Sequence, residues 1–313
     1  MVENQKVAVV TGSSSGIGFE TSLALARNGY LTYATMRNLQ KSKALEGIAQ
    51  DENLLLKTIE MDVDCDHSVR KAIDGIIDGS GRIDVLVNNA GFGLFGSLED
   101  LEMVEIKKQF ETNVFGVIRV TKNVLPTMRL GQNGIIVNIS SIAGLAGIPS
   151  QTIYCGSKFA VEGLSESLSF EVEPFGIKVI VVEPGVINTE FARDLVVPTA
   201  IYGVDEKGKQ INSSFPKDKN GALLSPYSNT IGKFLSFYYK AMGSAPHPKV
   251  VADETIKAIE KVSNGNNAEP ILRVTVGKES KKYSELKREI SDSEFHKILR
   301  EDLLEEVELF SIE

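Results

Sequence analysis

The chain has 313 residues, of which 42% are hydrophobic and 24% charged, as is ordinary for a globular protein. Its formal net charge of −8 argues against a nucleic-acid-binding surface. Two cysteines are too few for a disulfide framework, and the three histidines have no partners at metal-ligand spacing, so no metal site is expected.

Membrane and export signals are missing from the sequence. No apolar run approaches the roughly 20 residues needed to span a bilayer. The first residues, Met1 to Lys6, lack the apolar core of a signal peptide. We therefore expect a cytoplasmic protein without a membrane span.

Short apolar segments alternate with helical patterns along the chain. The predicted strands are Val7–Thr11, Leu31–Thr35, Leu54–Met61, Ile83–Val87, Ile135–Ile139, Val179–Val182 and Ile271–Val276. The clearest helical patterns are Asp66–Asp78, Leu101–Leu130 and Ser150–Val172. Strands that alternate with helices predict βαβ units and a parallel sheet covered on both faces. We expect one Rossmann-like α/β domain over residues 1–313, with a doubly wound parallel sheet of about seven strands.

Two segments interrupt this alternation. Residues 185–250 are rich in proline, glycine and tyrosine, which favours a partly ordered lid over a substrate site. Residues 278–313 carry charges of both signs, with Leu299, Leu303, Leu304 and Val307 at helical spacing. This tail is predicted to be an amphipathic helix packed on its own domain, because its mixed charges do not suit a membrane or partner helix.

A glycine-rich loop joins the first strand to the first helix. Its sequence is Thr11-Gly12-Ser13-Ser14-Ser15-Gly16-Ile17-Gly18. Glycines allow a tight turn and a close approach of the backbone to a pyrophosphate, and the start of the helix offers free N–H groups. The alternative is a tight turn that binds nothing.

Polar motifs follow the later strands in a fixed order. They are Asn88-Asn89-Ala90-Gly91, Glu111-Thr112-Asn113-Val114, Asn138-Ile139-Ser140-Ser141, the pair Tyr154 and Lys158, and Pro184-Gly185 with Thr189. Tyr154 and Lys158 are four residues apart, so they share one helix face. A nearby ammonium, helped by an oxidised nicotinamide, would lower the phenol pKa and let Tyr154 act as an acid/base. Ser141 can hold the same substrate oxygen.

Together these motifs resemble the short-chain dehydrogenase/reductase family, over roughly residues 5 to 195 and Ile271–Val276. The resemblance implies that Tyr154 is the acid/base, that Lys158 binds the nicotinamide ribose and tunes Tyr154, and that Ser141 orients the substrate. Ser140 is the neighbouring alternative. Asn113 would position a water in a proton relay.

The cofactor expected from the loop and the resemblance is NADP(H), with NAD(H) as the alternative. No Asp or Glu occurs between Glu20 and Glu46 to bind a ribose 2′-hydroxyl, whereas Arg37 can pair with a 2′-phosphate. Arg37 can also be a solvated surface arginine, and the loop has no Lys or Arg of its own. The expected cofactor-binding residues are Gly12, Ser14, Ser15, Gly16, Ile17, Gly18, Arg37, Asp62, Val63, Asn89, Ala90, Gly91, Tyr154, Lys158, Pro184, Gly185 and Thr189.

The substrate would be a carbonyl or alcohol compound. The segment Tyr154–Leu164 and the segment Tyr33–Arg37 resemble the steroid and retinol dehydrogenase subgroup. A hydrophobic pocket would be lined by Phe92, Leu94, Phe95, Ile142–Ile148 and the long segment after Gly185; the alternative is that these residues only pack the core. Relatives are usually dimers or tetramers through two long helices, here Leu101–Leu130 and Ser150–Val172.

Two other functions are compatible with the fold. A nucleotide-sugar epimerase or dehydratase typically has T-G-x-x-G-x-x-G spacing and a larger C-terminal domain, neither of which this sequence has. A non-catalytic Rossmann sensor often loses the tyrosine or the lysine, whereas this chain keeps both. Substituting Tyr154→Phe would distinguish a sensor from an oxidoreductase.

Overall fold

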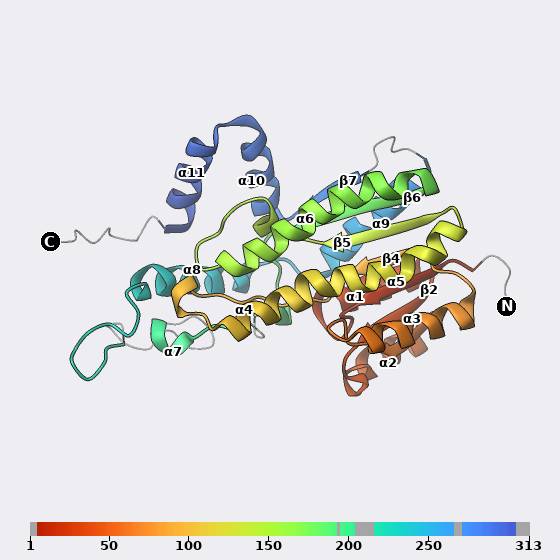
Figure 1. Cartoon of the computed structure of the whole chain (residues 1–313), viewed down its shortest axis with the longest axis horizontal. Coiled ribbons are helices and arrows are strands. Elements are labelled where there is room, and N and C mark those ends of the chain that lie inside the picture. Colours follow the sequence, from red (N-terminus) through yellow and green to blue (C-terminus); the bar gives the residue numbers. More distant parts are fainter. Residues whose placement is uncertain (1–4, 193–194, 204–215, 266–270, 305–313) are drawn as a thin grey trace.

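The computed structural model describes residues 5–192, 195–203, 216–265 and 271–304. At its centre is a parallel sheet of seven strands in the order β3-β2-β1-β4-β5-β6-β7 (Figure 1). The strands are β1 Val7–Thr11, β2 Leu31–Met36, β3 Leu56–Glu60, β4 Val85–Asn88, β5 Gly134–Ile139, β6 Ile177–Pro184 and β7 Ile271–Val276. The predicted α/β class and the seven strands are confirmed, with ends that differ by up to two residues.

Helices cover both faces of the sheet because the strands are apolar on both sides. The helices are α1 Gly16–Arg27, α2 Lys43–Asp51, α3 Asp66–Ser80, α4 Met103–Phe110, α5 Gly116–Leu130, α6 Thr152–Val172, α7 Thr199–Tyr202, α8 Ser228–Ser244, α9 Lys249–Ser263, α10 Lys278–Glu289 and α11 Asp292–Leu304. One core layer joins α3, α5 and the end of α6 to the sheet, and another joins α1 and α9 to its opposite face (Figure 1). Among the described residues, no helix is both long and apolar enough to cross a membrane.

The strand order reverses at β1, which pairs with β2 on one side and with β4 on the other. The chain leaves these strands in opposite directions, so a crevice opens beyond their carboxyl ends. The glycine loop, the asparagine motif after β4 and the serine motif after β5 all leave the sheet at this edge.

The predicted long helix Leu101–Leu130 is divided in the structure. A π-helical turn, Glu111–Phe115, lies between α4 and α5 and contains Asn113. Such turns add a residue to the helix and are frequent at functional sites. Here the turn lets the Asn113 side chain reach the backbone of Phe92. The apolar periodicity of residues 101–130 does not reveal this break in the helix.

The segment predicted as a lid contains α7, α8 and the first residues of α9. Asp100 anchors it, because the Asp100 carboxylate accepts hydrogen bonds from Tyr202 Oη at 2.6 Å and Ser225 Oγ at 2.7 Å. Tyr202 is fully buried. These bonds hold the segment against the residues that precede α4.

The charged tail forms two helices, α10 and α11, where one was expected. Tyr283, Phe295 and Leu299 pack together against the turn that follows β5, and Leu304 joins the cluster around α8. The tail therefore lies over the carboxyl edge of the sheet, beside α8 (Figure 1). Val307 lies outside the described residues.

Candidate active site

A cavity of about 800 Å³ opens at the carboxyl edge of the sheet. Three of the four expected catalytic residues line it, Ser141, Tyr154 and Lys158. The expected cofactor residues that also line it are Gly12, Ser14, Ser15, Gly16, Ile17, Arg37, Asp62, Val63, Asn89, Ala90, Gly91, Pro184, Gly185 and Thr189. Asn113 and Gly18 do not line the cavity.

Gly18 acts through close packing. A Cβ atom at this position would lie 2.4 Å from both Asn89 Nδ2 and the carbonyl oxygen of Gly12. Glycine therefore lets α1 begin directly against the residue that follows β4. Gly12 has φ +70° and faces the backbone of Ala90, so it too needs the absence of a side chain.

The asparagine motif is tied to the glycine loop by hydrogen bonds. Asn89 Nδ2 donates to the carbonyl oxygens of Thr11 and Gly12 at 2.9 and 3.1 Å. Thr11 Oγ1 accepts from the backbone N–H groups of Asn89 and Ala90, both at 2.9 Å. Thr11, which was not among the expected site residues, thus joins the two loops that flank the crevice.

The start of α1 is suited to an anionic ligand. Ser15 precedes the helix and makes no side-chain hydrogen bond to its first turn, and no acidic residue lies in that turn. The N–H groups there remain available, next to the cavity-lining residues Gly16 and Ile17. A pyrophosphate fits this loop.

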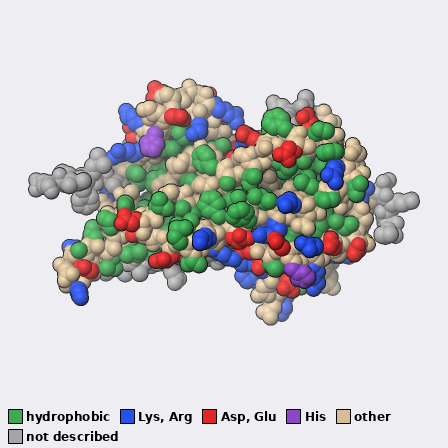
Figure 2. Space-filling model, in the orientation of Figure 1, with side chains coloured by type: hydrophobic (Ala, Val, Ile, Leu, Met, Phe, Trp, Pro, Cys, Tyr) green, Lys and Arg blue, Asp and Glu red, His purple; other side chains and the backbone are tan. Residues whose placement is uncertain are grey.

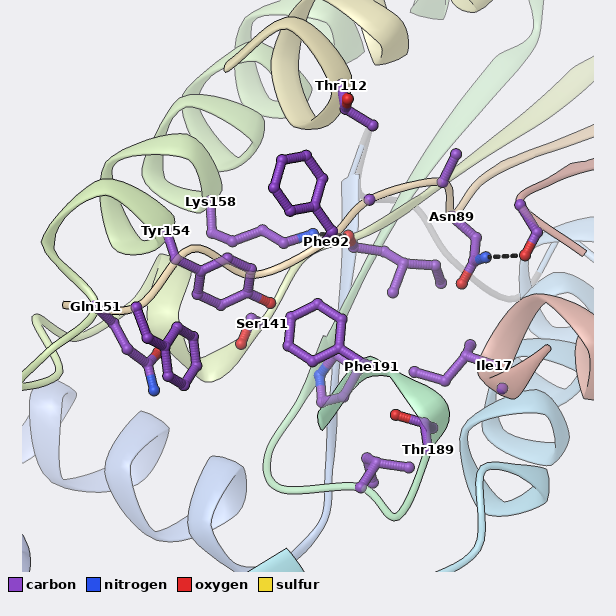
Figure 3. A pocket seen from close by; sticks show the side chains of 18 of the residues that line it. Ile17, Asn89, Phe92, Thr112, Ser141, Gln151, Tyr154, Lys158, Thr189 and Phe191 are labelled. Carbon is purple, nitrogen blue, oxygen red and sulfur yellow. Dashed lines mark hydrogen bonds between the residues drawn. The ribbon is translucent and has the colours of Figure 1, made fainter. Parts of the chain in front are cut away.

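The structure brings Tyr154 and Lys158 of α6, two of the residues expected to be catalytic, together with Ser141, which follows β5. The Tyr154 hydroxyl points toward Ser141, and the Lys158 side chain runs alongside the tyrosine ring (Figure 3). Lys158 Nζ lies 5.7 Å from the centroid of that ring and donates to the carbonyl oxygen of Ile139 at 2.8 Å. This arrangement agrees with the expected geometry of an acid/base pair and an oxygen-orienting serine.

The acidity of Tyr154 differs from the expectation. Burial raises the pKa of the Tyr154 phenol above its ordinary value, and the hydrogen bond with Ser141 only partly opposes this. Burial also lowers the pKa of Lys158 to about 8. Desolvation disfavours the charged form of each group, so the side chains alone do not produce the acidic phenol that the i, i+4 spacing suggested.

Asn113 lies behind the cavity wall. Its Oδ1 accepts from the backbone N–H of Phe92 at 3.1 Å, and its Nδ2 donates to the Phe92 carbonyl and to Ser157 Oγ. These bonds fasten the segment after β4 to α6. The side chain therefore holds the cavity wall, and the role of Asn113 in a water relay stays a prediction.

Aromatic side chains lie beside Tyr154. The Phe191 ring centroid lies 5.6 Å and the Phe95 ring centroid 6.0 Å from that of Tyr154, and Tyr238 of α8 lies 5.2 Å from Phe95. Of the residues that were expected either to line a pocket or to pack the core, Phe92, Phe95, Ile142 and Ile148 line the cavity, whereas Leu94 is fully buried and does not line it. The segment after Gly185 contributes Phe191, Phe234, Phe237 and Tyr238 to the lining, and the three phenylalanines were not singled out from the sequence.

Two basic residues that follow β2, Arg37 and Lys41, line the cavity, and so do Asp62 and Val63, which follow β3. Lys41 was not among the expected residues, although its position four residues after Arg37 could have drawn attention to it. Two cations suit a phosphate group better than one.

The C-terminal tail supplies a further part of the wall. Glu279 and Tyr283 of α10 and Leu303 of α11 line the cavity. Ser280 Oγ also donates to the carbonyl oxygen of Glu183 at 2.6 Å, which fixes α10 to the end of β6. The tail is thus part of the site and does more than cover the domain surface.

Comparisons with known proteins agree with this site. A family model described as short chain dehydrogenase matches residues 6–198. The chain belongs to this family. Its members are NAD(P)-dependent oxidoreductases, and the predicted family is therefore confirmed.

Individual relatives extend the comparison. A 3-ketodihydrosphingosine reductase of Bacteroides thetaiotaomicron is 46% identical over 59% of this chain and 65% of its own length. Human retinol dehydrogenase 8 is 40% identical over 64% of this chain and 65% of its own length, in line with the predicted subgroup. The matches thus span slightly less than two thirds of these relatives. A short-chain dehydrogenase structure from Streptomyces avermitilis has a TM-score of 0.71 at 27% identity, covering 98% of this chain and 100% of that one.

Proposed function

We propose that this short-chain dehydrogenase interconverts a ketone or aldehyde and the corresponding alcohol on a hydrophobic substrate, and that it prefers NADP(H). The observation that carries the proposal is one cavity lined by three kinds of residue. They are the glycine loop with the cations Arg37 and Lys41, the pair Tyr154 and Ser141, and the aromatic Phe191, whose ring lies 5.6 Å from that of Tyr154.

Each side chain has a defined task in this reaction. A bound nicotinamide cofactor supplies or accepts the hydride, and its oxidised form adds a positive charge that favours the phenolate. Tyr154 gives its proton to the carbonyl oxygen during reduction, or takes the alcohol proton during oxidation. Ser141 holds that oxygen as negative charge grows on it. Lys158, as in the family, binds the ribose and tunes Tyr154.

The preference for NADP(H) rests on Arg37. Replacing Arg37 by serine is expected to weaken NADPH binding by about 10- to 100-fold, because one charge-assisted hydrogen-bonding partner of the 2′-phosphate is lost. NADH binding should change little. The two dissociation constants are measured by titrating cofactor fluorescence.

The control for this change is Lys43→Ser. Lys43 is an exposed cation six residues from Arg37 that does not line the cavity. The Lys43→Ser substitution should leave the dissociation constants for NADPH and NADH unchanged. Equal losses for NADPH and NADH in Arg37→Ser would show that Arg37 does not read the 2′-phosphate.

The proposed substrate is long-chain or polycyclic and mostly apolar. The rings of Phe95 and Phe191 lie beside that of Tyr154, and Tyr238 lies beside Phe95. Pockets of this kind bind mainly by burying apolar surface. The chemistry of the named relatives, a keto-sphingoid reductase and a retinol dehydrogenase, supports the same class.

The test is NADPH oxidation with a series of ketones of increasing alkyl length, together with retinal and keto-steroids. The ratio kcat/KM should rise about fourfold for each methylene group that is buried. A series that favours short polar ketones would contradict the apolar substrate. Tight NADPH binding without turnover on any compound would favour the sensor.

A dimer through α5 and α6 is also proposed. Figure 2 shows hydrophobic side chains gathered over the face formed by α4, α5 and α6. Phe115, Phe159 and Phe170 are exposed on it, with Phe170 67% exposed. Patches of this kind usually mark protein interfaces, and homo-oligomers most often close by two-fold symmetry.

Introducing a charge tests this interface. Phe170→Glu is expected to convert the dimer to a monomer in size-exclusion chromatography with light scattering. Leu55→Glu, at a 51% exposed residue just before β3, is the matched control and should leave the dimer intact. A wild-type protein that is monomeric at micromolar concentration would refute the proposal.

A further inference from the structure

Four titratable side chains follow one another along one face of α6. Tyr154, Lys158, Glu162 and Glu166 are each four residues apart, so they form a line from the cavity toward the helix surface. The Glu162 side chain is only 8% exposed, whereas that of Glu166 is 58% exposed. The carboxyl group nearest to Lys158 along this line is therefore buried.

Glu162 belongs to a cluster of carboxyl groups around one cation. Arg273 of β7 donates from Nη1 to Glu162 and, at 2.9 Å, to Glu183 of β6, and from Nη2 to Glu166. Glu183 is completely buried. Three carboxyl groups thus share a single guanidinium group, so Arg273 cannot neutralise all of them.

Each of the two buried carboxyl groups has one oxygen without a partner. Glu162 Oε1 and Glu183 Oε2 make no hydrogen bond within the described part of the chain. Glu162 Oε1 also borders Gly144, in the turn that follows Ser141: a Cβ atom at Gly144 would lie 3.2 Å from it and 3.0 Å from Glu162 Cγ. Glu162 is therefore packed directly against the turn Ile142–Gly144.

The charges in this cluster act on one another and on Lys158. Burial lowers the pKa of Lys158, and the negative charge of Glu162 opposes that effect. Burial and then the Glu162 charge raise the pKa of Glu183, while Arg273 and Arg288 of α10 lower it. Two buried carboxyl groups that share one donor favour a state with one of them protonated.

We propose that Glu162 is a positioning residue that keeps Lys158 protonated, with Glu183 as its proton-carrying partner and Arg273 holding both. Glu162 lies one helical turn from Lys158 along α6, so its carboxylate brings negative charge of the cluster close to the lysine. This inference deepens the proposed function, since it concerns the lysine that tunes Tyr154. Its test requires neither substrate nor cofactor.

The experiment measures the protonation of Lys158 directly. Wild type and Glu162→Gln are labelled with trace acetic anhydride at a series of pH values, and mass spectrometry quantifies acetylation of the peptide that contains Lys158. The labelling midpoint of Lys158 in the wild type is expected near the pKa of about 8. In Glu162→Gln it should fall by about one pH unit, because the opposing charge is gone.

Three control variants make the result specific. Glu166→Gln removes an exposed carboxylate that also contacts Arg273, and Glu183→Gln replaces the protonated partner by a neutral group. Glu162→Asp keeps the charge. All three should keep the wild-type midpoint of Lys158 labelling, because each variant retains a negative charge at position 162. If Glu162 only packed the structure, the midpoint would not move in Glu162→Gln.

The proposal is overturned if folded Glu162→Gln keeps the wild-type midpoint, or if Glu166→Gln shifts it equally. Circular dichroism checks the fold of each variant. If glutamine at this position prevents folding, Glu162→Met tests the same loss of charge with an apolar side chain of similar length. Failure of the proposed function would appear separately, as a lack of turnover in a protein whose Lys158 still titrates as described.

Discussion

The Tyr154→Phe protein is expected to lose at least a hundredfold, and up to about ten-thousandfold, in kcat while it keeps its fold and its affinity for NADPH. General acid/base catalysis typically contributes a factor of this size. Phenylalanine fills the same space between Phe95 and Phe191, so the aromatic contacts remain. Steady-state kinetics and cofactor titration measure the two quantities separately.

The matched control is Tyr238→Phe. Tyr238 lines the same cavity and is a partly buried tyrosine whose pKa is raised by desolvation, but it is not placed beside Ser141 and Lys158. Its loss of a hydroxyl group should change kcat by less than about tenfold. If both variants lose activity to the same degree, Tyr154 has no special role as the acid/base.

Replacing Lys158 by methionine is expected to abolish turnover and yet to stabilise the protein at pH 7. The activity should fall by a factor of about 10² to 10⁴, since Tyr154 loses the group that tunes it. The ammonium group is buried, and its pKa is lowered to about 8 from 10.5. Methionine removes that buried charge, so the free energy of unfolding should rise by roughly 1–3 kcal/mol, allowing for the lost hydrogen bond to Ile139.

The pH dependence of this effect has a definite sign. Between about pH 8 and 10.5 the unfolded chain still binds the Lys158 proton while the folded protein has released it. The contribution of this group to wild-type stability therefore rises with pH through that window. The advantage of Lys158→Met should shrink over the same range.

Urea unfolding at pH 7 and pH 9.5 measures this difference. Lys122→Met, at an exposed lysine of α5, is the control and should show no such dependence. A Lys158→Met protein that is less stable than the wild type at both pH values would contradict a buried, charged lysine.

The parts of the site that could be predicted depend on local rules. The i, i+4 spacing places Tyr154 and Lys158 on one face of α6, whatever the rest of the chain does. The backbone of Gly12, at φ +70°, needs glycine in the loop after β1. Alternation of apolar strands with helices was enough to predict the parallel sheet, since each signal lies within a few residues.

Other parts arise only when distant segments meet. The Arg273–Glu162 contact joins residues 111 apart in sequence, and the Tyr202–Asp100 bond joins residues 102 apart. No periodicity encodes such pairs. The same holds for the share of the cavity wall that comes from Tyr283 and Leu303, because the tail reads locally as a charged surface helix.

The protonation states of Tyr154 and Lys158 depend most strongly on tertiary structure. The spacing of Tyr154 and Lys158 predicts that they lie close together, but their pKa values are set by how much water the fold removes around them. Burial raises the first and lowers the second, and Glu162 acts against the shift of Lys158. The order of the residues thus determines which chemistry is available, while desolvation in the folded protein determines the pH at which it operates.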